Sequence, residues 1–509
     1  MSFTHARRAF RACAAAAVAW VLHASPGLQA ATGHLPRSAP ERQGVSSTAL
    51  LDAVDALDRV DQVHSLMVVR HGQVVAEAWW GPYDAETPHE LYSLSKSFTS
   101  TAVGLAVGEG LLRVEDPVLR YLGSDGPEQP SGNLRAMRIR DLLTMTTGHQ
   151  DEPPLSPSQM TARTFLAQPV PHKPGTHFKY NTPATFMQSA LVQKVSGMTT
   201  AEYLQPRLFS PLGITHVRWD TNSQGINLGG YGLRLRTEDI AKFGQLLLQR
   251  GKWEGRPLIA EGWVREATSR QVSNGSNPDN DWEQGYGYQF WRCRHGAYRG
   301  DGACGQFCIV LPEQDAVIVV TSGVSDMAGL LNQLWDTLLP AFQKGSLKAN
   351  ALARQRLEQR LLKLQVRMPS GNTTATLAPQ VLGKTFRFPA NDRGLESLTL
   401  ETSGSKGWLL TRTIGGKTES LRCGYGRWMT GRGHLGDSPR GPVGALEEES
   451  LGASAAWTSD DTWTVKICAR GTPFQTIHHL KFSEQDLTLS TLSPIRLGGK
   501  PATPLQGRP

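Results

Sequence analysis

The sequence predicts an α+β domain with a helical subdomain, followed by a separate all-β domain. Strand patterns occur at residues 65–80 and again at 286–321, and helical patterns lie between them. Strands from distant parts of the chain with helices between them imply one sheet flanked by helices. Short alternating runs then fill the last part of the chain. At roughly 100 to 200 residues per domain, 509 residues allow two to four domains.

The mixed domain is expected over about residues 31–345. Residues 65–80 are rich in Val and are interrupted at His71-Gly72, which predicts a two-stranded hairpin. Apolar residues at helical spacing predict a helix over 93–107. Another helix is expected to begin at Thr237, whose hydroxyl can cap it, and to end near Gln249. The remaining expected elements are strands over 286–293, 307–311 and 316–321 and a helix over 330–339.

A linker and a second domain follow. Residues 346–380 change from a charged helical pattern to a loop rich in Pro, Gly, Ser and Thr, which is typical of a linker. Over residues 381–509, alternating runs are separated by Gly, Asp and Ser turns, which predicts an all-β accessory domain. These runs are 397–401, 408–412, 462–467 and 487–491.

The first thirty residues have the layout of a bacterial signal peptide. Basic residues from Arg7 to Arg11 precede an apolar run over 12–23 that is too short to cross a bilayer, and Ala30 offers a cleavage point. The Arg-Arg-x-Phe order resembles the twin-arginine export type. We therefore expect a periplasmic or secreted protein without a later transmembrane segment, and an uncleaved anchor is the alternative.

Charge and cysteine content narrow the function classes. The formal net charge is +8, but no block of five like charges occurs, so a nucleic-acid partner is unsupported. Five cysteines remain after the signal peptide. Cys423 and Cys468 are the two in the last part of the chain, and in an oxidising compartment we expect them to pair. No cysteine or histidine cluster has zinc spacing, so neither a metal nor a cofactor is expected.

The motif Ser-x-x-Lys occurs twice. At Ser403 it lies in a Gly/Ser loop, where nothing fixes the side-chain spacing, and we interpret it as a surface turn. At Ser93 it opens a predicted helix and places Lys96 about one turn away on the same face. A serine hydroxyl needs a neighbouring base, which a lysine becomes when burial lowers its pKa. The alternative is a capping serine with a solvated lysine.

Further motifs follow Ser93 in a fixed order and resemble the serine β-lactamase and penicillin-binding-protein superfamily. The likeness is to its class C-like branch, which includes many esterases and amidases. It covers about residues 40–345 and implies a β-lactamase-like antiparallel sheet flanked by helices. The stretches that carry it are 90–100, 110–118, 141–149, 174–182, 211–214, 237–249 and 302–306.

The resemblance implies an acyl-enzyme mechanism. Ser93 would be the nucleophile, Lys96 the partner that moves its proton, and Tyr180 the general acid and base from the family's Tyr-x-Asn motif. Thr182 stands at the third place of that motif, with Asn181 in the middle, so a hydroxyl replaces the usual amide at this substrate-binding position. A tyrosine that packs beside a Pro-Gly turn is the alternative interpretation of Tyr180.

The family's third motif, Lys-Thr-Gly or His-Thr-Gly, is absent. Alignment on the following Gly-x-x-Gly-Gln places Gly300-Asp301-Gly302 there, and the last two of these are candidates for substrate binding. The backbone N–H groups of Ser93 and Ala303 would form the oxyanion hole. The cation that helps to hold a substrate carboxylate in the β-lactam-hydrolysing members is missing. Arg299 could replace it, although alternation along a strand favours the other face.

The sequence therefore predicts an exported serine hydrolase that cleaves a carboxylic ester or amide, in a small-molecule or peptide-like substrate, through an acyl-enzyme on Ser93. A β-lactamase or D-Ala-D-Ala peptidase of the same fold is the alternative among enzymes. The departures at Thr182 and Gly300 leave a non-catalytic envelope-binding protein as an alternative from another class. We expect His149 to be structural and Trp291 to line the core or the cleft. The sequence indicates no oligomeric state.

Overall fold

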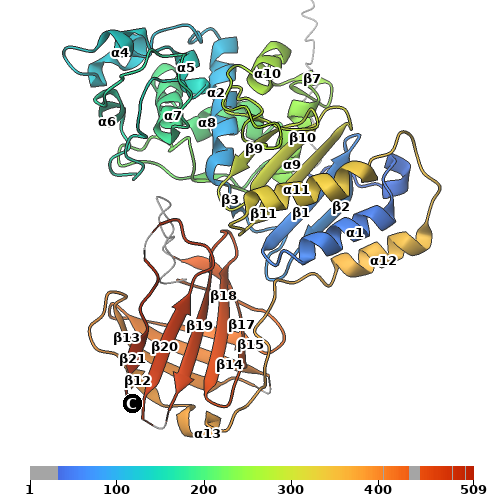
Figure 1. Ribbon diagram of the computed structural model, residues 1–509, viewed down its shortest axis with the longest axis vertical. Helices are drawn as coiled ribbons and strands as arrows, with labels where there is room; N and C mark the ends of the chain where they lie inside the picture. The colour runs from blue at the N-terminus through green and yellow to red at the C-terminus, as the bar shows by residue number, and fades with distance from the viewer. Residues whose placement is uncertain (1–32, 405, 435–447, 484, 499) are drawn as a thin grey trace, which may run out of the picture.

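The computed structural model describes residues 33–404, 406–434, 448–483, 485–498 and 500–509. The signal peptide predicted over residues 1–30 lies outside these ranges. Within them, no helix combines the length and the apolar character that crossing a membrane requires. An α+β unit and an all-β unit follow one another along the longest axis of the molecule (Figure 1).

A six-stranded antiparallel sheet forms the centre of the first unit. The predicted hairpin and the strands predicted over 307–311 and 316–321 join in it, since Met67 pairs with Val319, and this confirms the expected α+β arrangement. Of the strand predicted over 286–293, only residues 291–292 are formed. His71 and Gly72 both have positive φ (49° and 73°), as tight hairpin turns require. In spatial order the strands are β2 (Gln73–Trp79), β1 (Val63–Arg70), β11 (Ala316–Ser322), β10 (Gln306–Leu311), β9 (Tyr298–Gly302) and β8 (Trp291–Arg292).

Helices cover both faces of this sheet (Figure 1). β1 is buried along its whole length, and its residues alternate between two cores. Leu66 and Val68 belong to the core that also contains α1 and α11 residues, whereas Met67 and Val69 belong to the core with α2 and α9. The covering helices are α1 (Ser47–Asp58), α11 (Met327–Leu338) and α12 (Ala351–Leu361) for the first core, and α2 (Ser95–Gly108) and α9 (Thr237–Leu248) for the second.

Part of the predicted linker is packed against the first unit. α12 contacts α1, and Leu357 is buried in the same core. Arg360 on α12 forms ion pairs with Asp55 (2.7 Å) and Asp58 (2.6 Å) of α1. The extended connection to the second unit therefore begins after Leu361.

A helical subdomain is inserted between the early and late strands (Figure 1). It is built mainly of short helices around the longer α7, and α2 packs on α7 from the side of the sheet. Its helices are α3 (Leu119–Leu122), α4 (Gly132–Ala136), α5 (Ile139–Leu143), α6 (Ala162–Leu166), α7 (Thr182–Ser196) and α8 (Thr200–Leu204). Nearby are α10 (Glu261–Thr268), the small sheet β3 (His89–Glu90), β5 (Leu233–Leu235) and β4 (Arg218–Trp219), and the pair β6 (Lys252–Trp253) and β7 (Arg256–Pro257).

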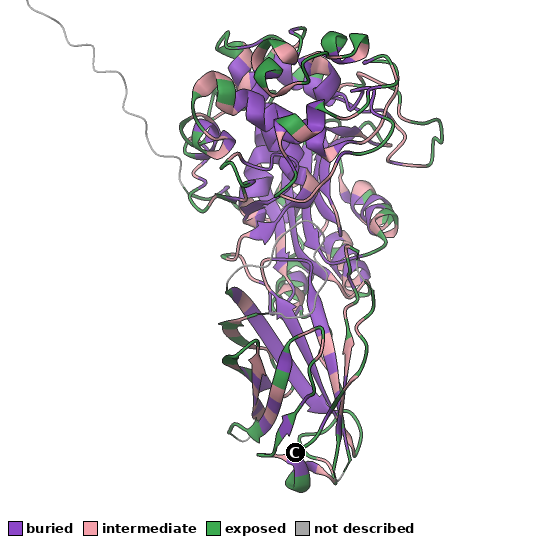
Figure 2. Ribbon diagram, turned by 90° about the vertical axis from the view of Figure 1, so that its left-hand side faces the viewer, coloured by how far each residue is buried: buried purple, intermediate pink, exposed green. Residues whose placement is uncertain are grey.

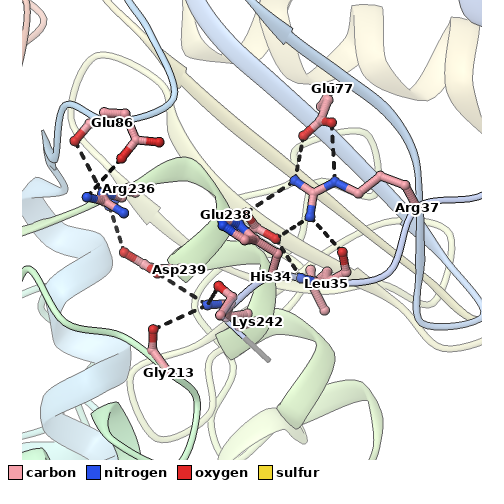
Figure 3. Close-up of polar contacts among 11 residues, drawn as sticks. His34, Leu35, Arg37, Glu77, Glu86, Gly213, Arg236, Glu238, Asp239 and Lys242 are labelled. Atoms are coloured by element: carbon pink, nitrogen blue, oxygen red, sulfur yellow. Dashed lines mark hydrogen bonds and ion pairs between the residues drawn. The ribbon is translucent and has the colours of Figure 1, made fainter. Parts of the chain in front are cut away.

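The start of α9 is tied to the segment that enters the first unit. Arg37 lies between Glu77 of β2 (2.8 Å) and Glu238 in the first turn of α9 (2.6 Å), as Figure 3 shows. The expected cap at Thr237 is wrong. The N-cap position is Arg236, and the Thr237 hydroxyl instead donates to a serine hydroxyl of β1 (2.8 Å). The Thr237 hydroxyl therefore hydrogen-bonds to a buried acceptor on the sheet instead of capping α9.

The second unit is a ten-stranded sheet, and the predicted all-β class is confirmed. Its two ends meet, because the backbones of Arg387 and Arg508 exchange hydrogen bonds of 2.7 and 2.9 Å. Buried residues lie along its strands, as they do in the core of the first unit (Figure 2). After α13 (Ala378–Val381) come β12 (Thr385–Arg387), β13 (Leu395–Thr402), β14 (Gly407–Ile414), β15 (Lys417–Gly424), β16 (Met429–Gly433), β17 (Glu449–Trp457), β18 (Thr462–Ala469), β19 (Gln475–Phe482), β20 (Leu487–Leu492) and β21 (Leu505–Gly507).

The expected disulfide between Cys423 and Cys468 is wrong, because all five cysteines within the described residues are free and buried. Cys423 on β15 lies opposite Trp408 of the neighbouring strand. Cys468 on β18 packs in the core of the first unit, where it hydrogen-bonds with the Tyr83 hydroxyl. The two thiols therefore belong to different cores, which the spacing of cysteines along a sequence does not reveal.

Candidate active site

Ser93 lies in a single 3₁₀ turn (Tyr92–Leu94) immediately before α2, rather than in the helix itself. Ser93 is partly exposed, whereas the residues on both sides of it are buried. Tyr92 has φ of +48°, a left-handed conformation that costs free energy for a residue with a side chain. The backbone just before the candidate nucleophile is therefore held in an uncommon geometry by its surroundings.

Lys96 faces Ser93 from the first turn of α2. Its Nζ lies 3.0 Å from Ser93 Oγ and 2.9 Å from the carbonyl oxygen of Gly230, and its side chain is buried. Burial lowers the pKa of Lys96 to about 7, although the carboxylates of Glu152 and Asp301 act in the opposite direction. A substantial fraction of this amine is therefore neutral at neutral pH and can accept a proton.

Tyr180 completes the group that the sequence predicts. Lys96 Nζ lies 5.0 Å from the centroid of its ring, and the ring stacks on Trp291 at 5.4 Å with an interplanar angle of 18°. Burial raises the pKa of Tyr180 well above its ordinary value, Asp301 adds to the rise, and hydrogen bonding to Ser93 opposes it. The hydroxyl therefore keeps its proton near neutral pH, so it can act as a proton donor.

The start of α7 places the residues that follow Tyr180. Asn181 is the N-cap of this helix, and its buried side chain accepts a hydrogen bond from the Ala184 N–H (3.1 Å). The Thr182 N–H donates to Glu152 Oε1 (2.7 Å). A Cβ added to Gly230 would lie 2.6 Å from the Thr182 methyl group, so this side chain packs directly on the backbone that binds Lys96. The Asn181 side chain therefore caps α7, and Thr182, at the position predicted to contact substrate, carries a hydroxyl group.

Arg299 is fully buried and bound to Asp301, so it does not supply the missing cation of the third motif. Its Nε and Nη2 lie 3.0 and 2.9 Å from Asp301 Oδ2, and its guanidinium lies over the rings of Trp282 and Trp291. The two residues share one face of β9, as alternation along a strand requires. Because Trp291 also stacks on Tyr180, this ion pair supports the wall behind the candidate acid.

Glycines occupy the other face of β9 because the strand lies close to the nucleophile turn. A Cβ at Gly300 would lie 2.5 Å from both Leu94 Cδ1 and Ser97 Oγ. A Cβ at Gly302 would lie 2.0 Å from the carbonyl oxygen of Leu91. A lysine or histidine at position 300 would therefore require the side chains of Leu94 and Ser97 to shift.

Breaking the Arg299–Asp301 pair should be costly for stability. We expect Arg299→Met to lower the free energy of unfolding by about 3–5 kcal/mol, since it leaves a buried carboxylate without its partner. Urea unfolding of the full chain measures this. The double variant Arg299→Met/Asp301→Leu should recover much of the loss, and a double variant as unstable as the single one would contradict the account.

The turn after β9 is firmly held. The Gln306 amide donates to the Ala303 carbonyl (3.0 Å), and the Ser322 hydroxyl lies within hydrogen-bonding distance of the carbonyls of Cys304 (2.7 Å) and Gly305 (2.8 Å). Cys304 and Gly305 both have positive φ. The backbone of Ala303, the predicted second oxyanion donor, is thus fixed by strand β11 next to it.

Glu90 supports the nucleophile turn, a role that no motif in the sequence indicates. Its Oε1 accepts hydrogen bonds from the N–H groups of Tyr92 (3.2 Å) and Gly232 (2.9 Å), and Arg234 Nη2 lies 3.2 Å from its other oxygen. Burial raises the pKa of Glu90 to about 7. The only available signal was an acidic residue three positions before Ser93.

Another residue singled out in the sequence is structural. His149 is buried, its Nδ1 lies 2.9 Å from the Thr147 hydroxyl, and burial lowers its pKa to about 4. In the ranges that the structure describes, no group of three or more His, Cys, Asp or Glu side chains is arranged to hold a metal ion.

A helix-covered antiparallel sheet, an inserted helical subdomain and a Ser-x-x-Lys turn facing a tyrosine define the serine β-lactamase and penicillin-binding-protein superfamily. The Beta-lactamase family profile matches residues 59–329. This is more than half of the chain, and the chain belongs to that family. The resemblance inferred from the motifs is thereby confirmed, and the protein is a hydrolase of the β-lactamase fold.

The following relatives share at most 25% of their residues with this chain. A 6-aminohexanoate-dimer hydrolase of Paenarthrobacter ureafaciens is 25% identical over 292 residues, which cover 52% of this chain and 73% of the relative. Two further curated relatives match this chain across 50% of their own length. The solved structure of EstCE1, a hydrolase with promiscuous acyltransferase activity, aligns with a TM-score of 0.48 at 18% identity, covering 58% of this chain and 99% of that one. The octameric penicillin-binding protein homologue from Pyrococcus abyssi aligns with a TM-score of 0.46 at 16% identity, covering 86% and 97%.

Proposed function

We propose that the chain is a serine hydrolase that cleaves a carboxylic ester or amide through an acyl-enzyme on Ser93. The observation that carries the proposal is the buried Lys96 amine, 3.0 Å from Ser93 Oγ and with a pKa lowered to about 7. A solvated lysine at the start of a helix would have neither the burial nor the lowered pKa. This arrangement supplies the base that a serine nucleophile needs.

The proposed reaction has two halves. In the first, Lys96 accepts the Ser93 proton while Oγ attacks the carbonyl carbon, and the N–H groups of Ser93 and Ala303 receive the charge on the carbonyl oxygen. Tyr180 then donates its proton to the leaving alcohol or amine, and the proton on Lys96 replaces it. In the second half, a water molecule gives up a proton to the same groups and attacks the acyl carbon. The bond from that carbon to Ser93 Oγ then breaks, and these groups return the proton to Oγ.

The third-motif position favours esters and amides over β-lactams. Position 300 carries a glycine packed against Leu94 and Ser97 and supplies no cation, and Arg299 is already bound to Asp301. Near the site, Glu152 adds negative charge that a substrate carboxylate would meet, whereas the charge of Asp301 is paired with Arg299. We therefore propose substrates without a carboxylate beside the scissile bond. The amide named in the Paenarthrobacter relative, the dimer of 6-aminohexanoate, belongs in the panel to be tested.

Two measurements test the function. A fluorophosphonate probe should label the full chain at Ser93, with the modified peptide identified by mass spectrometry, and Ser93→Ala should remain unlabelled. Hydrolysis of short-chain esters, small amides and a fluorescent penicillin is then compared. Turnover of esters or amides with little turnover of penicillin supports the proposal. Rapid penicillin hydrolysis would instead indicate a β-lactamase, and a long-lived penicillin adduct would indicate a peptidase. If no probe labels the chain and no substrate is turned over, the result would favour a non-catalytic envelope-binding protein.

Tyr180→Phe tests the role of the phenol. It keeps the ring that stacks on Trp291 and removes the hydroxyl. We expect kcat for an ester or amide substrate to fall by about 10²-fold, with little change in thermal stability, because general acid catalysis is lost while packing remains. An unchanged kcat in steady-state assays would assign the proton donor to another group.

We also propose that the protein is exported to the periplasm or the medium. The support is the basic and apolar order of residues 7–23, followed by a cleavage point at Ala30. Fractionation of expressing cells, with N-terminal sequencing of the product, tests this proposal.

A further inference from the structure

The second unit reaches the nucleophile turn of the first unit through one short loop. Residues 470–474 connect β18 and β19, and the upper ends of these strands are directed at β3 and β11 (Figure 1). We call this segment the 470–474 loop. It contains Gly471, Pro473 and Phe474, and residues 472–474 are buried. A turn at the tip of an accessory domain would ordinarily be exposed.

The 470–474 loop contacts consecutive residues that lead into Ser93. The Glu90 N–H donates to the Gly471 carbonyl (2.8 Å), so the loop occupies a backbone acceptor position beside β3. The Thr472 backbone hydrogen-bonds with the buried His89 ring. The Phe474 ring meets the Tyr92 ring edge-on, with 6.5 Å between the centroids. Three of the four residues before the nucleophile are thus held by the second unit.

The same loop contacts the strand end that fixes the other oxyanion donor. A Cβ added to Gly323 would lie 2.5 Å from the Pro473 carbonyl oxygen, so these backbones are in direct contact. Gly323 stands between Ser322 and Val324, which both hydrogen-bond the Cys304 carbonyl (2.7 and 3.1 Å). Cys304 follows Ala303 directly. The loop is therefore connected to both predicted oxyanion donors, Ser93 and Ala303, through only a few intervening residues.

Further polar contacts hold the 470–474 loop and the end of β18. Arg470 Nε donates to the Pro82 carbonyl (2.7 Å), and its guanidinium forms an ion pair with Asp84. Lys466 Nζ donates to the Arg367 carbonyl (3.0 Å). Arg470 belongs to the loop and Lys466 lies on β18 just before it, and both side chains are largely buried, so displacing the loop would break polar contacts at a cost in free energy.

The left-handed backbone at Tyr92 explains why such support matters. A residue with a side chain at φ of +48° tends to relax unless neighbouring groups hold it. Glu90 holds the Tyr92 N–H from one side, and Phe474 packs on its ring from the other. Relaxation there would move the N–H and Oγ of Ser93 together, because both follow directly in the same 3₁₀ turn.

We propose that the 470–474 loop is a positioning element of the active site, which sets the two oxyanion N–H groups by holding residues 89–92 and 322–324. The second unit is then part of the catalytic apparatus rather than a separate binding module. The inference rests on the proposed function of Ser93. It assigns a positioning role to Phe474 and Gly471, and neither residue touches substrate.

The variants are made in the full chain. Phe474→Ala removes the ring on Tyr92, Phe474→Leu restores apolar volume, and Gly471→Ala adds a Cβ that would lie 2.8 Å from the Pro88 carbonyl oxygen. The matched control is Phe386→Ala, which removes an equally buried ring that packs on Phe482 inside the second unit. Each protein is assayed for the rate constant of fluorophosphonate labelling at Ser93, for kcat and KM with an ester, and for its unfolding midpoint.

Misplacement of oxyanion donors lowers the rate of the chemical step more than binding. We expect Phe474→Ala and Gly471→Ala to lower the labelling rate constant and kcat by about 10- to 100-fold, with KM changed by less than about threefold. Phe474→Leu should recover most of the rate, and Phe386→Ala should keep the native rate although it unfolds earlier.

Native labelling rates in both Phe474→Ala and Gly471→Ala would overturn the positioning role, and so would an equal loss of rate in Phe386→Ala. If Phe474→Ala does not fold, Gly471→Ala and Phe474→Leu decide the question by the same criteria. Failure of the proposed function itself has a different outcome, because the native chain would then not be labelled at Ser93 at all.

Discussion

Ser93→Ala should abolish hydrolysis of every substrate that the native chain accepts. The substitution removes the attacking Oγ and keeps the backbone N–H of residue 93, so substrate binding and the oxyanion donors are retained. Loss of a nucleophile that acts as a unit with its base costs about 10⁴- to 10⁶-fold in kcat. Initial rates with the best ester or amide found in the substrate panel measure the effect.

Its matched control lies in the same chain. Ser403 opens the second Ser-x-x-Lys sequence, in an exposed turn of the all-β unit. Ser403→Ala should therefore leave kcat and KM at native values. A Ser93→Ala protein that folds and still hydrolyses its substrates at the native rate would remove the acyl-enzyme mechanism altogether.

The candidate site was largely predictable because its chemistry is local or is carried by a motif. Ser93 and Lys96 are one helical turn apart, so spacing alone places them together, and 3.0 Å separates Oγ from Nζ. Tyr180 was found only through the resemblance, since no local pattern joins it to Ser93. Glu90 was missed because its partners, among them Gly232, come from another part of the chain.

The strand β9 shows a second limit of sequence reasoning. The alternation of side chains along a strand correctly places Arg299 and Gly300 on opposite faces of β9. It does not identify the residues that pack against each face. The buried ion pair with Asp301 and the contact of Gly300 with Leu94 are tertiary facts. In the sequence, the departure at Gly300 from the family's third motif therefore appears only as the loss of a cation. In the structure it appears as a strand packed closely on the nucleophile turn.

The fold class and the all-β unit followed from periodicity, but the contact between the units did not. Residues 470–474 have the composition of an ordinary turn, Arg-Gly-Thr-Pro-Phe. Hydrophobic pattern reports that Phe474 is apolar, not that its partner is Tyr92, more than 380 positions earlier (474 − 92 = 382). The expected Cys423–Cys468 bridge failed for the same reason, since Cys468 faces the first unit.

The pH dependence of the reaction should report the titration of Lys96. The amine is a base only when it is neutral, and burial lowers its pKa to about 7 against an ordinary value of 10.5. Rates should therefore be low in acid and rise with pH through a midpoint near 7. Glu152 and Asp301 both favour the charged amine, whereas Gly230 supplies an uncharged acceptor. Glu152→Gln removes one of these charges and should move the midpoint to lower pH.

Lys96→Met should remove this dependence together with most of the activity. Methionine fills a similar volume in the buried site but cannot accept the Ser93 proton, and general base catalysis contributes about 10²- to 10⁴-fold. We expect kcat/KM to fall within that range and the residual rate to lose its midpoint near 7. Profiles of kcat/KM between pH 5 and 9 for the native chain, Lys96→Met and the surface control Lys406→Met provide the measurement. A midpoint near 7 that survives in Lys96→Met would assign the titrating base to another group, of which the buried Glu90 is the first candidate.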